Sequence, residues 1–111
     1  MNKYLLLPLV FLMTFSPASF GHHSISPYDS TRRHEVEGVV TKQNWRNPHA
    51  KFEISVTNSE GGTESWDIEA DAVNTLIRRG LKREDMAVGQ TLRFYGRPSS
   101  RGRNELFALI C

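Results

Sequence analysis

Apolar and polar residues alternate on both sides of a short corner, and this pattern constrains the fold more than any other feature of the chain. Residues 34–44 place valine or glycine at every second position from 36 to 40, and residues 50–57 place phenylalanine, isoleucine and valine in the same way. That period of two is typical of a strand with one buried face. The corner between them, residues 45–49, reads Trp-Arg-Asn-Pro-His. The sequence therefore predicts two strands that meet at a corner rich in functional groups.

Three more strands are predicted after the corner. A glycine-rich loop at 58–62 ends the second strand, and the alternation of residues 64–69 indicates a third. A fourth strand places Leu92 and Phe94 on its inner face, and a fifth lies at 105–110. Both faces of this last segment are apolar, so its register does not follow from the pattern.

A short helix is predicted between the third and fourth strands. Val73, Leu76 and Ile77 have the i, i+3, i+4 spacing of one helical face. Asp71 is placed to cap the start of this helix, and Gly80 is placed to close its end.

The order of three strands, one helix and two strands favours a small closed barrel. Gly38 lies inside the first strand, where glycine commonly marks a bulge or a strong bend. Closing the sheet would remove the exposed edges of so small a β structure. We therefore predict an all-β fold with one short helix, a five-stranded OB-like Greek-key barrel, with an open sheet covered by the helix as the alternative. The predicted core residues are Phe52, Ile54, Trp66, Ile68, Leu76, Leu92 and Phe94.

The first residues have the pattern of a secretory signal peptide. Lys3 precedes an apolar run at 4–15, and small residues follow it. The run is shorter than the roughly 20 apolar residues of a membrane span, although an uncleaved anchor is the alternative reading. We expect a signal peptide at 1–21, an irregular arm at 22–33 and the barrel at 34–111. The mature protein is then periplasmic and has no transmembrane segment.

Two positions satisfy the small-residue rule for signal cleavage, one after Gly21 and one after Ala18. The only cysteine is Cys111, so the domain cannot form an internal disulfide. Packing alone must hold the mature domain together, and we expect a monomer.

Several motifs occur along the chain in a recognisable order: His22-His23-Ser24, Gly38 to Lys42, Trp45 to His49, Trp66 to Glu69, Asn74, Leu76, Arg79-Gly80, Gly89 and Gly96-Arg97-Pro98. Together these motifs resemble a family of small exported bacterial proteins that is catalogued as a domain of unknown function. The resemblance covers nearly the whole mature chain and implies a periplasmic OB-like barrel, with no established activity. In that family the histidine pair commonly follows the cleavage point, which favours the cut after Gly21. Leu81 departs from the pattern, since the family often has tryptophan there.

The histidines are candidate metal ligands. Cleavage after Gly21 would give His22 a free α-amine beside its imidazole, and His23 or His49 would add a further nitrogen. Nitrogen ligands with an open position suit copper better than tetrahedral zinc. The alternative is a solvated arm, with His49 forming a structural hydrogen bond. Copper binding is thus the second function that we consider.

The corner is also a candidate recognition surface. OB-folds bind ligands across strands two and three and through nearby loops. Trp45 could stack on a ligand and Asn47 could form hydrogen bonds with it, or both could be structural. Glu69 could accept a hydrogen bond from His49 and fix its tautomer, or it could cap the helix or face water.

Neither nucleic-acid binding nor catalysis is favoured. Acidic residues are interspersed among the basic ones, the net charge is only +2, and export would separate the protein from cellular nucleic acid. No serine lies in a nucleophile-elbow sequence, and Cys111 has no placed base. We therefore expect a non-catalytic binding or accessory module. Its partner would be a peptide, a glycan or another envelope protein.

Overall fold

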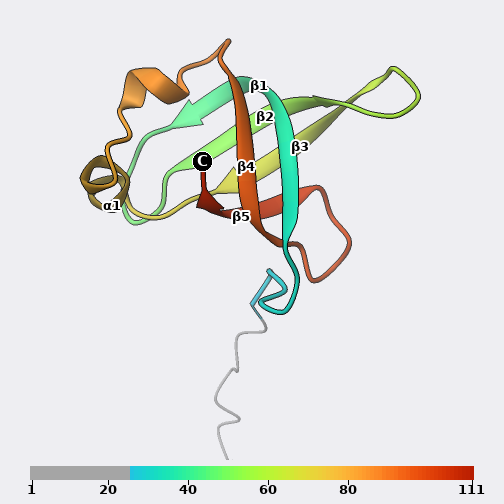
Figure 1. The fold of residues 1–111 in the computed structure, drawn as a ribbon, viewed down its shortest axis with the longest axis horizontal. Helices are drawn as coiled ribbons and strands as arrows, with labels where there is room; N and C mark the ends of the chain where they lie inside the picture. Colours follow the sequence, from blue (N-terminus) through green and yellow to red (C-terminus); the bar gives the residue numbers. More distant parts are fainter. Residues whose placement is uncertain (1–25) are drawn as a thin grey trace, which may run out of the picture.

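Five strands and one short helix follow one another in the predicted order in the computed structural model, which describes residues 26–111 (Figure 1). The expected cleavage points and the pair His22 and His23 lie outside the described residues. No helix within residues 26–111 is long and apolar enough to cross a membrane. The elements are β1 (His34–Asn44), β2 (Lys51–Thr57), β3 (Thr63–Glu69), α1 (Val73–Arg78), a 3-10 helix η1 (Arg83–Met86), β4 (Thr91–Pro98) and β5 (Glu105–Ile110).

The strands close into a barrel in the order β1-β2-β3-β5-β4. Strand β1 pairs with β4 along His34–Val39 and with β2 along Val39–Asn44, so one bent strand serves both halves of the sheet. Strands β3 and β5 pair in parallel, while the other neighbours are antiparallel. The predicted OB-like barrel is confirmed.

Close backbone approach explains the glycine in β1. A Cβ atom at Gly38 would lie 2.5 Å from the Ser55 carbonyl oxygen, so a larger residue would push β1 away from β2. The pairing of β1 and β2 then shifts between Val40 and Lys42, which marks a bulge at Thr41. The predicted bulge in β1 is present, and it lies at Thr41. Glycine is needed at position 38 because the backbones of β1 and β2 approach closely there.

The barrel interior is filled by the residues whose alternation predicted the strands. Of the seven predicted core residues, Trp66 and Leu92 are only partly buried and pack against the core from its margin. The rings of Phe52 and Phe94 lie 5.9 Å apart at its centre. The buried core consists of Val36, Val40, Ala50, Phe52, Ile54, Ile68, Ala70, Leu76, Met86, Phe94, Leu106 and Ala108.

Helix α1 begins differently from the prediction. Ala72 occupies the N-cap position, and its side chain forms no capping hydrogen bond. The prediction that Asp71 caps the helix is wrong, because its carboxylate pairs instead with Arg79 at 2.9 Å. The Val73 N–H donates to the Asn47 side-chain oxygen at 2.9 Å, so a residue of the corner satisfies this helix terminus.

The end of α1 follows the prediction. Gly80 has a φ of +88°, a conformation that glycine adopts without strain. Its N–H donates to the Ile77 carbonyl, and the Leu81 N–H donates to the Leu76 carbonyl. These two bonds form the Schellman arrangement that closes a helix.

The described part of the arm is attached to the barrel beside β4. Tyr28 forms an isolated antiparallel bridge with Ser99. The Asp29 N–H donates to the Pro98 carbonyl, and the Ser100 N–H donates to the Pro27 carbonyl, both at 2.8 Å. The arm therefore reaches the barrel several residues before the first strand begins.

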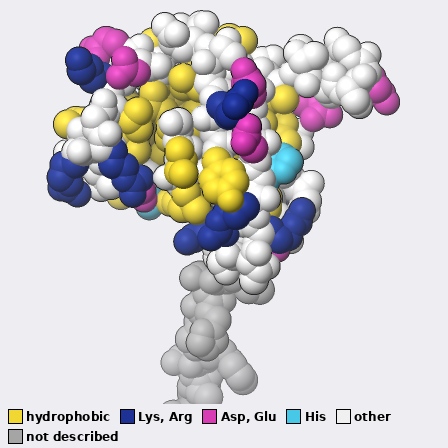
Figure 2. Space-filling view, viewed as in Figure 1, with side chains coloured by type: hydrophobic (Ala, Val, Ile, Leu, Met, Phe, Trp, Pro, Cys, Tyr) yellow, Lys and Arg dark blue, Asp and Glu magenta, His cyan; other side chains and the backbone are white. Residues whose placement is uncertain are grey.

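The hairpin of β2 and β3 projects beyond the body of the barrel (Figure 1). In the face shown in Figure 2, this projection carries acidic side chains and no lysine or arginine. The sequence extends that observation to the hairpin beyond Lys51, because residues 52–77 contain no basic residue.

Candidate functional site

The corner residues do not converge on a single site. Trp45 is partly buried, packs against the core and lines a cleft with Ile77 and Leu81 near the end of α1. Asn47 contacts the start of α1 through the bond to Val73. These contacts agree with the structural alternative considered for both residues.

His49 is oriented by the main chain. Its Nδ1 lies 3.0 Å from the carbonyl oxygen of Ala70, and 43% of its side chain is exposed. A carbonyl oxygen only accepts hydrogen bonds, so a neutral ring that makes this bond carries its proton on Nδ1. Nε2 then holds the free lone pair of the imidazole.

Glu69 contacts the arm more closely than it contacts the histidine. Its nearer oxygen lies 4.0 Å from His49 Nδ1, which is too long for a hydrogen bond. Its other oxygen accepts a hydrogen bond from the Tyr28 hydroxyl at 2.8 Å. Burial, together with this bond to Glu69, raises the pKa of Tyr28 above its ordinary value, so the hydroxyl remains a donor.

Aromatic packing completes this cluster. The Phe107 ring, on β5, lies 5.6 Å from the Tyr28 ring and 6.0 Å from the His49 ring, measured between centroids. The arm, the corner and the third and fifth strands therefore meet at Tyr28, His49, Glu69 and Phe107. Sequence reasoning missed Tyr28 because it lies in a segment without periodicity, 41 residues before Glu69.

Two adjoining clefts form a trough across the outer surface of β2 and β3. The first has a volume of about 380 Å³ and the second about 500 Å³. Lys51, Phe52 and Asp67 line both clefts, so the two clefts adjoin at these residues. This is the face at which OB-fold barrels take ligands. The first cleft is also lined by Pro27, Tyr28, Ile68, Glu69, Arg101, Arg103 and Glu105, and the second by Thr41, Lys42, Gln43, Asn44, Glu53 and Val88.

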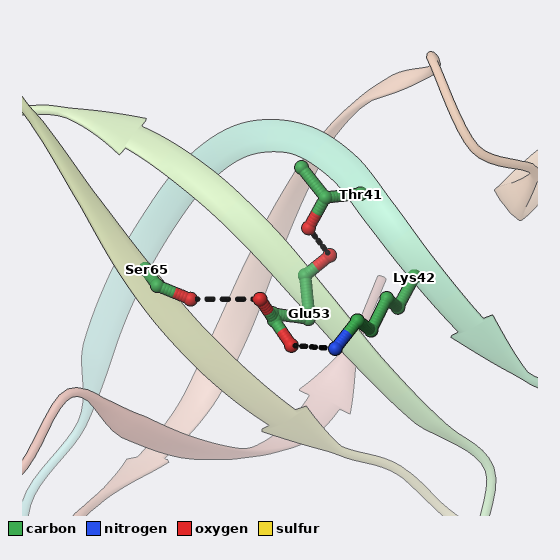
Figure 3. Close-up of polar contacts among 4 residues, drawn as sticks. All are labelled: Thr41, Lys42, Glu53 and Ser65. Atoms are coloured by element: carbon green, nitrogen blue, oxygen red, sulfur yellow. Dashed lines mark hydrogen bonds and ion pairs between the residues drawn. The ribbon is translucent and has the colours of Figure 1, made fainter.

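Glu53 fixes one wall of the trough (Figure 3). Its carboxylate accepts a hydrogen bond from Ser65 at 3.2 Å and pairs with Lys42 at 3.4 Å. Its carbonyl accepts a bond from the Thr41 hydroxyl at 3.0 Å, at the bulge of β1. Contacts from both neighbouring strands thus hold Glu53, whereas Lys51 and Asp67 are exposed on the floor.

Metal ligands do not gather in the described part of the chain. Residues 26–111 contain no group of three or more His, Cys, Asp or Glu side chains that could hold a metal ion. The predicted copper site combined His49 with His22 and His23, which lie outside the described residues. Cys111 is exposed at the end of β5.

Comparison with known proteins identifies a family for this chain but no activity. No curated protein and no solved structure matches the chain significantly. The model of a protein family described as a family of unknown function, DUF6152, matches residues 10–107. Because this match spans nearly the whole sequence, the chain belongs to DUF6152, a family of unknown function.

Proposed function

We propose that this protein is an exported, periplasmic binding module that holds its ligand in the trough across β2 and β3. The two clefts that adjoin at Lys51 and Asp67 are the observation that supports this proposal most directly. The trough is built on strands of a closed barrel, so its floor is rigid. A signal-type segment at residues 4–15 supports export.

The trough offers charges of both signs together with hydrogen-bonding groups. Lys51 and Asp67 lie on its floor, while Arg101 and Glu105 line the end that contacts the arm. Volumes of this size suit a few residues of an extended ligand. A peptide, a glycan or a segment of another envelope protein has this shape.

The proposed role is binding without chemistry. His49, a common general base in other proteins, is bonded to the Ala70 carbonyl instead of a nucleophilic side chain. Glu69 is engaged by the Tyr28 hydroxyl. Both contacts hold the arm and the strands in place, and a module of this kind would act by presenting or tethering its ligand.

A ligand screen tests the proposed function. The fluorescently labelled chain is applied to arrays of peptides and glycans, and each ligand found is titrated in solution. The Lys51→Ala/Asp67→Ala double variant is expected to weaken binding at least about tenfold, because both residues lie in the trough centre. Lys82→Ala removes a charge near the end of α1, outside the two clefts that form the trough, and is expected to change affinity less than about twofold. Equal affinity of the double variant and the unchanged chain would contradict the proposal.

Copper binding at the mature N-terminus is a second candidate function. It is favoured by the hydrogen bond from His49 Nδ1 to a main-chain carbonyl, an arrangement that frees Nε2 and recurs in metal-binding histidines. The contact of Tyr28 with Glu69 also attaches the arm close to His49. His22 precedes Tyr28 by six residues, a span of up to about 20 Å, so its nitrogens can reach the same place.

Mass analysis of the N-terminus followed by copper titration tests this candidate. If His22 is the first residue of the mature protein, the electron paramagnetic resonance spectrum of bound Cu(II) is expected to change in His49→Ala. The spectrum is expected to remain unchanged in His34→Ala. Binding should weaken as the pH falls through about 6.5, because protonated imidazoles do not bind metals. An N-terminus at Ser19, or an unchanged spectrum in His49→Ala, would contradict a site that combines the arm with His49.

A further inference from the structure

One edge of β3 is unpaired over half of its length within the described residues. The strand runs from Thr63 to Glu69, but its pairing with β5 covers only Asp67 to Glu69. Strand β2 pairs along the whole of the other edge. In residues 26–111, the stretch from Thr63 to Trp66 therefore has a strand on one side only.

The hydrogen-bond pattern shows which groups point outward from this edge. The Asp67 N–H donates to the Asn104 carbonyl, on the side away from β2. The Gly62 carbonyl accepts from the Asn58 N–H, on the side toward β2. Because these directions alternate along a strand, Thr63 and Ser65 present their N–H and C=O groups outward.

The charge of the β2–β3 hairpin beyond Lys51 has one sign. From residue 52 to residue 77 every ionisable side chain is acidic, and Glu60 and Glu64 are exposed. Figure 2 shows acidic side chains on the projecting hairpin. Natural sheet edges are commonly protected by lysine, proline or a covering segment. A second copy of this chain would place like charges opposite one another, so the acidic edge disfavours self-pairing.

We propose that the outer edge of β3 at Thr63–Ser65 binds an extended peptide that carries lysine or arginine at alternate positions. The peptide would join the sheet as an additional strand and place its basic side chains against the acidic hairpin. This inference rests on the proposed binding function, because it names the ligand class of the same face. Asp67 lines the trough and is the first residue of β3 that pairs with β5, so the free edge adjoins the trough.

The test uses a fluorescein-labelled peptide of alternating lysine and valine, with alternating glutamate and valine as its control. Anisotropy titrations of the full chain are expected to show binding of the basic peptide only, and weaker binding as salt rises from about 0.02 to 0.15 M. Ser65→Pro removes the outward N–H but no hydrogen bond to β2, and it should lower the affinity at least about tenfold. Ser65→Ala removes only the hydroxyl that bonds to Glu53, and it should change the affinity less than about twofold. Circular dichroism of both variants establishes that they remain folded.

The outcomes separate this inference from the proposed function. If Ser65→Pro binds the basic peptide as well as Ser65→Ala does, pairing at the edge is excluded. If the basic peptide does not bind, while another ligand depends on Lys51 and Asp67, the inference falls and the proposed function stands. If no peptide or glycan binds, both proposals fall.

Discussion

Phe94→Ala is expected to lower the free energy of unfolding by about 3–5 kcal/mol. The Phe94 ring is fully buried and lies 5.9 Å from the Phe52 ring. Strand β4 pairs with both β1 and β5, so a cavity at Phe94 lies where the barrel closes. A domain of this size has about 5–15 kcal/mol of stability in total, and the loss should be plain in urea unfolding.

Tyr95→Ala provides the matched control on the same strand. Tyr95 is the next residue along β4, and 39% of it is exposed on the outer face of the barrel. Its replacement removes an aromatic ring without opening an internal cavity, so a cost below about 1 kcal/mol is expected. Similar losses for the two variants would show that the inner and outer faces of β4 are assigned wrongly.

The strands were predictable because each exposes one face to water and buries the other. The strand predicted at residues 34–44 from the alternation of Val36, Gly38 and Val40 coincides with β1, His34–Asn44. The apolar composition of β5 predicted that this strand exists, but it did not predict the register in which the strand pairs. It pairs with β3 on one side and β4 on the other, and only this pairing buries Leu106 and Ala108 while leaving Ile110 exposed.

The start of α1 was predicted wrongly because it depends on contacts between segments that are distant in the sequence. Aspartate is favoured at helix N-termini, so Asp71 was the local choice. In the folded chain Arg79 pairs with Asp71 from the end of the same helix, and Asn47 supplies the bond to Val73. No pattern in the sequence links position 47 to position 73, since the two meet only when the barrel forms.

The sequence predicted a candidate site centred on the corner, residues 45–49, whereas the two clefts lie across β2 and β3. That this face takes a ligand, as in other OB-folds, stays a prediction. The corner residues Trp45 and Asn47 face other elements, and the residues that extend the trough come from the arm and the turn before β5. Tyr28 and Arg101 carry no periodic signal, so their position depends on tertiary structure alone.

Gly96→Ala is expected to destabilise the barrel by about 3 kcal/mol or more, although it adds one methyl group. A Cβ atom at Gly96 would overlap the carbonyl oxygen of Phe107, on the paired strand β5. The clash involves the main chain of both strands, so side-chain rotation cannot relieve it. The pairing of β4 with β5 already shifts between Tyr95 and Gly96, which brings the two backbones together there. Separating them would loosen β5, the strand that joins β4 to β3 and closes the barrel. Thermal and urea unfolding measure the loss.

Gly62→Ala is the control for this prediction, because it makes the same chemical change in the exposed hairpin loop. A Cβ atom at Gly62 would meet only the Asn58 side chain, at 3.3 Å, and that side chain can move. A change of less than about 1 kcal/mol is therefore expected. If Gly96→Ala were as mild as Gly62→Ala, the two backbones could not lie as close as the structure has them. If both glycines were equally sensitive, general loss of glycine flexibility would explain the effect, and the contact with Phe107 would not.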